Sequence, residues 1–277
     1  MANKKNGCLT IIATLLVLVG FLIQQFNRDD RPEDVAAPDR SVVGRHLYGG
    51  APKTDGYPNT VKTLQRQGFV VGYDERRGSA AWVAYRLAGS PKFDSGERPR
   101  HFTIDDETES RVRSDDYTRS GYDRGHLAPN YGIATRYGRD AQIETFKMTN
   151  IIPQSPGLNR GLWRALEERI ASDDGLAETL EEVWIITGPL FGASPKTLPR
   201  TGIAIPDACY KIVIDEINGK PRAMGFVFPQ DIPRSAELER FLVPIDAIES
   251  RAMLDFLAAL PDRLERTIES HAPEALW

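Results

Sequence analysis

The sequence predicts an α+β fold with a largely antiparallel β-sheet. Strand-like segments outnumber helical ones and do not alternate with them regularly, as they would in a parallel sheet with crossover helices. Residues 209–215 and 223–228 have the pattern of a β-hairpin, with Asn218-Gly219 at its turn. The chain has 277 residues, of which 41% are apolar, so it is long enough to form one sizeable core.

Other elements are predicted from apolar periodicity and turn residues. The expected strands are 69–73, 81–87, 146–152 and 182–189, and the expected helices are 159–171 and 245–260. Residues 88–120 are rich in Gly, Pro and charge and have no clear pattern. A connection of that length inside a compact domain usually serves function.

The N-terminus predicts a membrane anchor. An apolar run from Cys8 to Ile23 follows Lys4 and Lys5 and precedes aspartates, which favours an N-in, C-out orientation. We therefore expect an anchor or signal at 1–26, a charged linker at 27–40 and a folded domain at 41–277. This places the domain outside the cytoplasm, in the periplasm or at the cell surface. Cleavage of the segment as a signal peptide remains the alternative, and it would make the protein secreted.

Charge and cysteine content narrow the choice of ligand. Residues 41–169 carry an excess of Lys and Arg, whereas residues 170–277 carry an acidic excess. The basic part would attract a polyanion, although scattered surface charge would give the same balance. Cys8 and Cys209 lie in different parts of the chain and predict no disulfide. With no CxxC or HxxxH pattern, a zinc site built from Cys and His is disfavoured.

One short stretch concentrates reactive side chains. Asp123-Arg124-Gly125-His126 joins an acid, a guanidinium and an imidazole, and Asn150, Asn159 and Glu167 follow within 41 residues of His126. Histidine can act as a base near neutral pH, and arginine binds phosphate through a planar pair of donors. Amide and carboxylate oxygens are ligands for hard divalent cations. These residue types together suit metal-assisted phosphodiester cleavage.

The same segments resemble the DNA/RNA non-specific endonuclease family, the ββα-metal nucleases that include endonuclease G-like enzymes. The resemblance rests on Asp123–Pro129, on Asn150–Gln154, and on Asn159, Trp163 and Glu167 at matching spacing. It covers about residues 41–262 and makes the folded domain a nuclease domain. It implies the ββα-metal nuclease fold, with a mainly antiparallel sheet flanked by helices.

The resemblance implies roles for the reactive residues. His126 is the expected general base, and it would stop accepting protons below the ordinary histidine pKa of about 6.5 if unperturbed. Asn159 is the expected sole protein ligand of Mg²⁺, with Mn²⁺ or another divalent ion as a substitute. Glu167 is expected to orient water near the metal.

Further residues have supporting roles by the same resemblance. Arg124 is expected to contact phosphate. Arg100 matches the arginine of an upstream loop by position, and Arg98 is the alternative match. Asn150 is expected to support the site and Asp123 to brace the loop.

The predicted activity is metal-dependent hydrolysis of DNA, RNA or both, with little sequence specificity because recognition is through the phosphate backbone. Two alternatives stay open, a hydrolase of another phosphodiester and a nucleic-acid-binding module that has lost catalysis. The expected partners are nucleic acid and, through the N-terminal segment, a membrane. The sequence leaves open whether the chain forms a homodimer.

Overall fold

A computed structural model describes residues 44–233 and 236–277 of this protein. The predicted anchor at 1–26 and the linker at 27–40 lie outside these described residues. Among the residues that are described, no helix has both the length and the apolar character of a membrane span.

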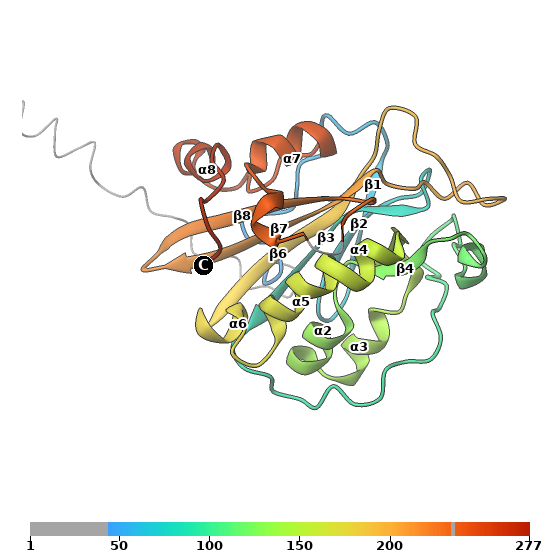
Figure 1. The fold of residues 1–277 in the computed structure, drawn as a ribbon, viewed down its shortest axis with the longest axis horizontal. Helices are drawn as coiled ribbons and strands as arrows, with labels where there is room; N and C mark the ends of the chain where they lie inside the picture. Colours follow the sequence, from blue (N-terminus) through green and yellow to red (C-terminus); the bar gives the residue numbers. More distant parts are fainter. Residues whose placement is uncertain (1–43, 234–235) are drawn as a thin grey trace, which may run out of the picture. The chain divides into compact units, whose positions relative to one another are not determined.

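A seven-stranded sheet with every neighbouring pair antiparallel forms the framework (Figure 1). Its strand order is β1-β2-β3-β6-β7-β8-β9, and a separate pair, β4-β5, lies beside it. The strands are β1 (Val61–Gln65), β2 (Val70–Asp74), β3 (Ser79–Ala88), β4 (Asp123–His126), β5 (Ile151–Gln154), β6 (Glu182–Leu190), β7 (Ala208–Ile217), β8 (Lys220–Pro229) and β9 (Leu242–Val243). The predicted antiparallel α+β architecture is confirmed.

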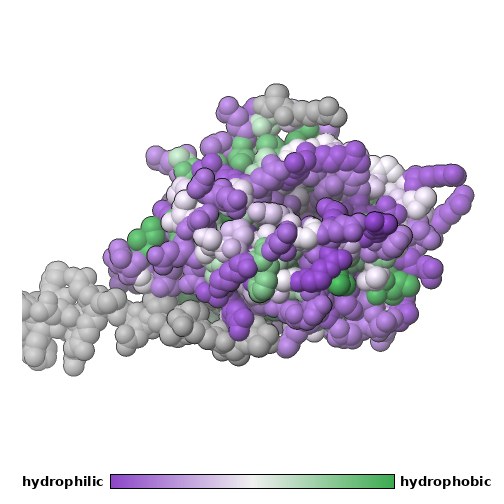
Figure 2. Space-filling model, turned by 90° about the horizontal axis from the view of Figure 1, so that it is seen from below, coloured by the Kyte–Doolittle hydropathy of each residue, from purple (hydrophilic) through white to green (hydrophobic). Residues whose placement is uncertain are grey.

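Helices cover both faces of the large sheet (Figure 1). On one face lie α2 (Asn130–Tyr137), α3 (Arg139–Glu144), α4 (Pro156–Leu158), α5 (Arg164–Ala171) and α6 (Leu176–Thr179), and on the other lie α7 (Ile245–Ala252) and α8 (Asp262–Glu269). Single turns occur at η1 (Ser114–Tyr117), η2 (Met148–Asn150), η3 (Asn159–Trp163) and η4 (Leu238–Phe241). Figure 2 shows the side that lies lowest in Figure 1, where α2 and α3 are found, as mostly hydrophilic.

The alternation of side chains along each strand divides the core into two layers. In β7, Cys209 and Val213 join the cluster that packs under α5, whereas Tyr210 and Ile212 join the cluster under α7. The same alternation places Lys211 on the α5 face, between two apolar neighbours. A charged residue therefore lies inside the layer that packs against α5, the helix that contains Glu167.

Several predicted elements are confirmed with small shifts at their ends. The hairpin of β7 and β8 turns at Asn218 and Gly219, whose φ values of 53° and 73° are those of a two-residue turn that follows the twist of the strands. The strand expected at 146–152 begins only at Ile151, because residues 148–150 form the turn η2.

The helix predicted at 159–171 is irregular in its first half. Gly161 has φ −104° and ψ −118°, and residues 159–163 form the wide turn η3 instead of a regular α-helix. A glycine adopts such values without the steric cost that a side chain brings. Asn159 and Glu167 therefore do not share one regular helix, although the predicted helix at 159–171 contains both.

The helix predicted at 245–260 was too long. Helix α7 ends at Ala252 because Met253 adopts a left-handed conformation, with φ 57° and ψ 38°. The carboxylate of Glu249 then accepts the Phe256 amide at 2.6 Å. A second helix, α8, begins after Pro261, in a segment for which the sequence made no prediction.

Candidate active site

Strand β4 contains the reactive tetrapeptide and is held against β5. His126 lies opposite Ile151 in the register. A Cβ added to Gly125 would lie 2.1 Å from the side-chain oxygen of Gln154. A side chain at this position would force the buried Gln154 side chain to move, so the glycine allows β4 to pack closely against β5.

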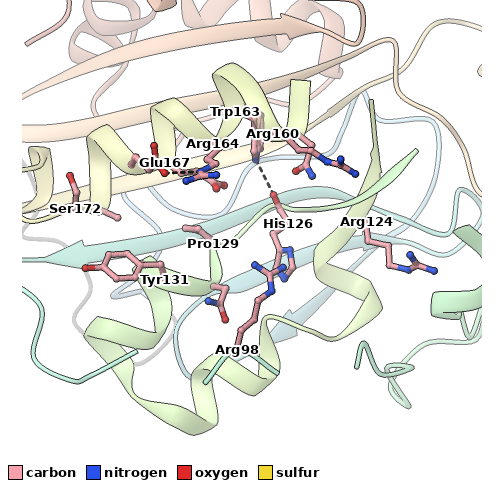
Figure 3. Close-up of a pocket in the computed structure, with 15 residues that line it drawn as sticks. Arg98, Arg124, His126, Pro129, Tyr131, Arg160, Trp163, Arg164, Glu167 and Ser172 are labelled. Carbon is pink, nitrogen blue, oxygen red and sulfur yellow. Dashed lines mark hydrogen bonds and ion pairs between the residues drawn. The ribbon is translucent and has the colours of Figure 1, made fainter. Parts of the chain in front are cut away.

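A pocket of about 820 Å³ opens beside β4 (Figure 3). Its wall is formed by β4, the start of α2, the η3 turn and α5, together with part of the loop that precedes β4. The structure thus brings together residues separated by up to 74 positions in the sequence. Those with reactive or charged side chains are Arg98, Arg124, His126, Asn159, Arg160, Arg164, Glu167 and Glu168.

His126 is a buried histidine with a fixed backbone. It is 8% exposed, and its ring lies 5.5 Å from that of Phe102 and 4.9 Å from that of Phe146. Its carbonyl accepts the Trp163 indole N–H at 3.1 Å. Burial, aided by the charge of Arg98, lowers the pKa of His126 to about 3. The imidazole is therefore neutral near pH 7 without substrate, and the acid limit expected near pH 6.5 moves far lower.

Asn150 fixes the chain that leaves His126. Its side-chain oxygen accepts the Ala128 amide at 2.8 Å. Its amide group donates to the Ala128 carbonyl at 2.9 Å and to the Thr145 carbonyl at 3.0 Å. Asn150 is fully buried and is not among the residues that line the pocket. Through these contacts Asn150 positions the backbone that follows His126.

Asn159 is oriented by Asp123. Its Nδ2 donates to Asp123 Oδ2 at 3.0 Å, and Arg160 adds two hydrogen bonds to the same carboxylate at 2.7 and 2.8 Å. No hydrogen bond within the described residues uses the Asn159 side-chain oxygen. The amide is thus anchored through its nitrogen and has a free oxygen at the pocket.

Glu167 faces a buried lysine from the central sheet. Lys211 is 0% exposed, and its Nζ lies 3.8 Å from Glu167 Oε1 and 4.2 Å from the centre of the Trp163 ring. The Lys211 ammonium also donates to the Tyr85 hydroxyl at 3.4 Å. Burial raises the pKa of Glu167 to about 7, against the opposing effect of Lys211. Lys211, and to a smaller extent Arg98, therefore favour the charged form of this carboxylate.

Arg124 lines the pocket and is partly engaged elsewhere. Its Nε donates to the Ser114 carbonyl at 3.0 Å, and Nη2 donates to the same oxygen at 2.5 Å. The guanidinium also lies 5.8 Å from the Tyr117 ring. These contacts hold the side chain in one position and leave Nη1 for another acceptor.

The two candidate arginines of the upstream loop separate clearly. Arg98 lines the pocket, and Figure 3 shows its guanidinium next to His126. Its charged group lies 5.1 Å from the centre of the Phe146 ring. Arg100 is not among the lining residues, has a side chain 78% exposed and pairs with Glu97 at 2.8 Å. The geometry places Arg98 at the pocket rather than Arg100.

The sequence did not single out Lys211, the buried cation that contacts Glu167. The signal was present in Cys209-Tyr210-Lys211-Ile212-Val213, where a single charged residue interrupts an apolar strand. A lysine buried in a sheet needs a partner, because an isolated charge is costly to bury. Only the packing of α5 over β7 shows that this partner is Glu167.

The donor set at the pocket fits a divalent cation. His126 Nε2 and Glu167 Oε1 are buried and have no hydrogen-bond partner among the described residues. Buried polar atoms are normally paired, so unpaired atoms beside a pocket indicate that ions, water or substrate complete the site. A single free amide oxygen from Asn159 suits Mg²⁺, which keeps several of its waters when a protein binds it.

Comparisons with known proteins identify the family of this chain. The model of the DNA/RNA non-specific endonuclease family matches residues 50–263. Human mitochondrial endonuclease G is 32% identical over 219 residues, which cover 73% of this chain and 71% of that protein. A nuclease from Nostoc sp. is 30% identical over 233 residues, which cover 80% of this chain and 82% of that protein.

The fold also matches a solved relative. A chain in a crystal structure of the EndoG/EndoGI complex aligns with a TM-score of 0.71 and 26% identity, covering 82% of this chain and 96% of that chain. The predicted ββα-metal nuclease fold is confirmed, with β4, β5 and the α4–α5 segment as its ββα unit. Because the family match extends over most of the chain, the protein belongs to the DNA/RNA non-specific endonuclease family.

Proposed function

We propose that this divalent-metal-dependent nucleic-acid hydrolase uses His126 as general base and Asn159 as the protein ligand of Mg²⁺. One observation carries the proposal. Two buried atoms that have no hydrogen-bond partner among the described residues, His126 Nε2 and Glu167 Oε1, belong to residues that line the same pocket as the Asn159 side-chain oxygen.

His126 accepts the proton of the attacking water. Its burial keeps the imidazole neutral and able to accept a proton at neutral pH. A phosphate in the pocket stabilises the imidazolium that forms, since a nearby negative charge raises the pKa of a histidine. Trp163 and Asn150 hold the backbone at and beyond His126, so the base is oriented before substrate binds.

Asn159 would hold Mg²⁺ through its side-chain oxygen, while Asp123 keeps the amide in place. When bound, the ion would supply positive charge that stabilises the scissile phosphate and the leaving 3′ oxygen. Glu167 accepts hydrogen bonds from water in the site and so orients it. Lys211 acts through Glu167 by favouring its ionised form.

Arg98 and Arg124 bind the phosphate oxygens and stabilise the charge that develops on them. Arg98 takes the part that the sequence suggested for Arg100, because it is the arginine of that loop that lines the pocket. Arg124 uses Nη1, the nitrogen that its contact with Ser114 leaves free. Contacts of this kind read the backbone, so sequence preference is weak and affinity falls steeply with salt.

Cleavage assays with matched variants test this mechanism. The purified protein is incubated with supercoiled plasmid and with RNA, with Mg²⁺ or with chelator, beside Asn159→Ala and His126→Ala. We expect Mg²⁺-dependent cleavage by the wild type and a loss of orders of magnitude in both variants, with unchanged circular dichroism. Normal cleavage by Asn159→Ala without extra metal would refute the ligand assignment. Faster turnover of a small phosphodiester than of either nucleic acid would favour the alternative substrate class.

We also propose that residues 1–26 anchor the nuclease domain outside the cytoplasm. The support is the lysines before the apolar run and the aspartates after it. A reporter that works only after export should be active when fused after Trp277, and activity of a cytoplasm-only reporter there would contradict the proposal. Detergent extraction distinguishes an anchored from a secreted protein. Light scattering of the extracted protein then tests whether the chain forms a homodimer.

A further inference from the structure

Three carboxylates converge between α7 and α8, on the sheet face opposite to the helices that border the pocket (Figure 1). Asp246 and Glu249 lie three residues apart on α7, and Glu269 ends α8. One oxygen from each lies within 4.8 Å of the oxygens of the other two. None of the three takes part in an ion pair among the residues that the structure describes.

Glu269 gives a second and independent indication of a ligand. The residue is 4% exposed, and its Oε1 is buried without a hydrogen-bond partner among the described residues. It is also one of the three converging carboxylates, so the unpaired atom belongs to a buried side chain that points into the cluster. A carboxylate that is buried without a partner is costly, and a cation or a proton removes that cost.

The surroundings strengthen the demand for positive charge. Glu265 precedes Glu269 by one helical turn, and Asp255 follows the end of α7. The nearby Lys53 forms an ion pair with Asp255, with Nζ and Oδ2 3.2 Å apart. Burial and the neighbouring carboxylates raise the pKa of Glu269 to about 9. Among the described residues, no lysine or arginine forms an ion pair with the three carboxylates of the cluster.

We propose that Asp246, Glu249 and Glu269 bind a hard divalent cation of the calcium type, in a site separate from the active site. Two oxygens that bind one Ca²⁺ at about 2.3–2.6 Å can lie up to about 5 Å apart, which accommodates the observed separation. Glu249 Oε1 accepts the Phe256 amide, which leaves the other oxygen of Glu249 for the ion. Asp246 is exposed, so water can complete the variable coordination that Ca²⁺ accepts.

The ion would join the two helices that cover this face of the sheet. Ile248 of α7 and Ile268 of α8 belong to the same apolar cluster, and each directly precedes a proposed ligand. Binding would therefore stabilise the folded domain without touching the catalytic residues. An ion that binds only the folded state raises the midpoint of thermal unfolding with its concentration.

Thermal unfolding of the full-length chain tests the proposal, with Ca²⁺ itself as the probe. The background variant is Asn159→Ala, which removes the expected contribution of the active-site ion. We expect Ca²⁺ to raise the midpoint above that measured in chelator, and NaCl of equal ionic strength to have no such effect. Calorimetric titration should show binding of a single ion. Glu269→Gln in the same background should abolish both the shift and the heat of binding.

Two further variants make the result decisive. Glu265→Gln removes a charge from the same helix and leaves the three ligands intact, so it should retain most of the Ca²⁺-dependent shift. Asp246→Asn, at an exposed position that does not endanger folding, should weaken Ca²⁺ binding if Glu269→Gln fails to fold. The proposal is overturned if Ca²⁺ has no effect on Asn159→Ala, or if Asp246→Asn or a folded Glu269→Gln responds like its parent. An equal loss in Glu265→Gln would also overturn it, because it would indicate diffuse attraction of ions to an acidic surface.

Discussion

Replacing Lys211 with methionine tests how the core of the sheet supports catalysis. Methionine resembles lysine in length and volume and lacks its charge, so the packing against Trp163 is largely kept. Lys211 Nζ lies 3.8 Å from Glu167 Oε1. At an effective dielectric constant of about 20, two unit charges at this separation attract by about 4 kcal/mol, equivalent to about three pKa units.

The loss of Lys211 should therefore leave Glu167 protonated at neutral pH. With the lysine present, burial already raises the pKa of Glu167 to about 7. A further rise of about three units would reduce the ionised fraction at pH 7 by roughly 10²–10³-fold. We expect kcat at pH 7 to fall by up to this factor, with KM for DNA little changed. Activity of the variant should recover as the pH is raised, because the carboxyl group then ionises.

A double-mutant cycle measured by plasmid nicking identifies the route of the effect. If Lys211 acts through Glu167, then Lys211→Met in a Glu167→Gln background should cost little further activity. Tyr85→Phe removes the hydroxyl that contacts Lys211 and keeps the charge, so it should remain close to wild type. A folded Lys211→Met with wild-type kcat at pH 7, or a full second loss in the double variant, would refute the reasoning.

His126→Ala should still bind Mn²⁺ and DNA, measured by calorimetry, while turnover falls by roughly 10²–10⁴-fold, the usual contribution of a positioned base. Loss of metal binding in that folded variant would make His126 a ligand. Arg98→Ala should lower the cleavage rate at least roughly 10-fold, the loss of about 1.4 kcal/mol of transition-state stabilisation, whereas Arg100→Ala should stay near wild type. The opposite order would return the phosphate contact to Arg100. Burial lowers the pKa of His46 to about 4, below that of an unfolded histidine, so its contribution to stability is present above about pH 6.5 and is lost as the pH falls toward 4. The melting temperature should accordingly drop through this window, and less so in His46→Leu, while an unchanged slope would contradict the assignment.

The sequence determined the strands and the reactive residues for local reasons. Short apolar runs bounded by turn residues specify buried strands, and Asn218-Gly219 specifies a tight hairpin turn, so both could be predicted without knowledge of the rest of the chain. The reactive tetrapeptide ending at His126 could be found because its chemistry depends on residue types at short spacing. Helix ends were harder to predict. Met253 adopts a left-handed conformation that no residue pattern predicts, and α7 therefore ends earlier than expected.

Only the tertiary structure decided which of these residues meet. The sequence favoured Arg100 over Arg98, whereas the path of the loop places Arg98 at the pocket and pairs Arg100 with Glu97. Lys211 becomes the partner of Glu167 because the order of strands puts β7 under α5, a relation between residues 44 positions apart. Burial also decides the protonation state of titratable residues, because the pKa of a carboxylate or an imidazole changes once the fold removes it from water.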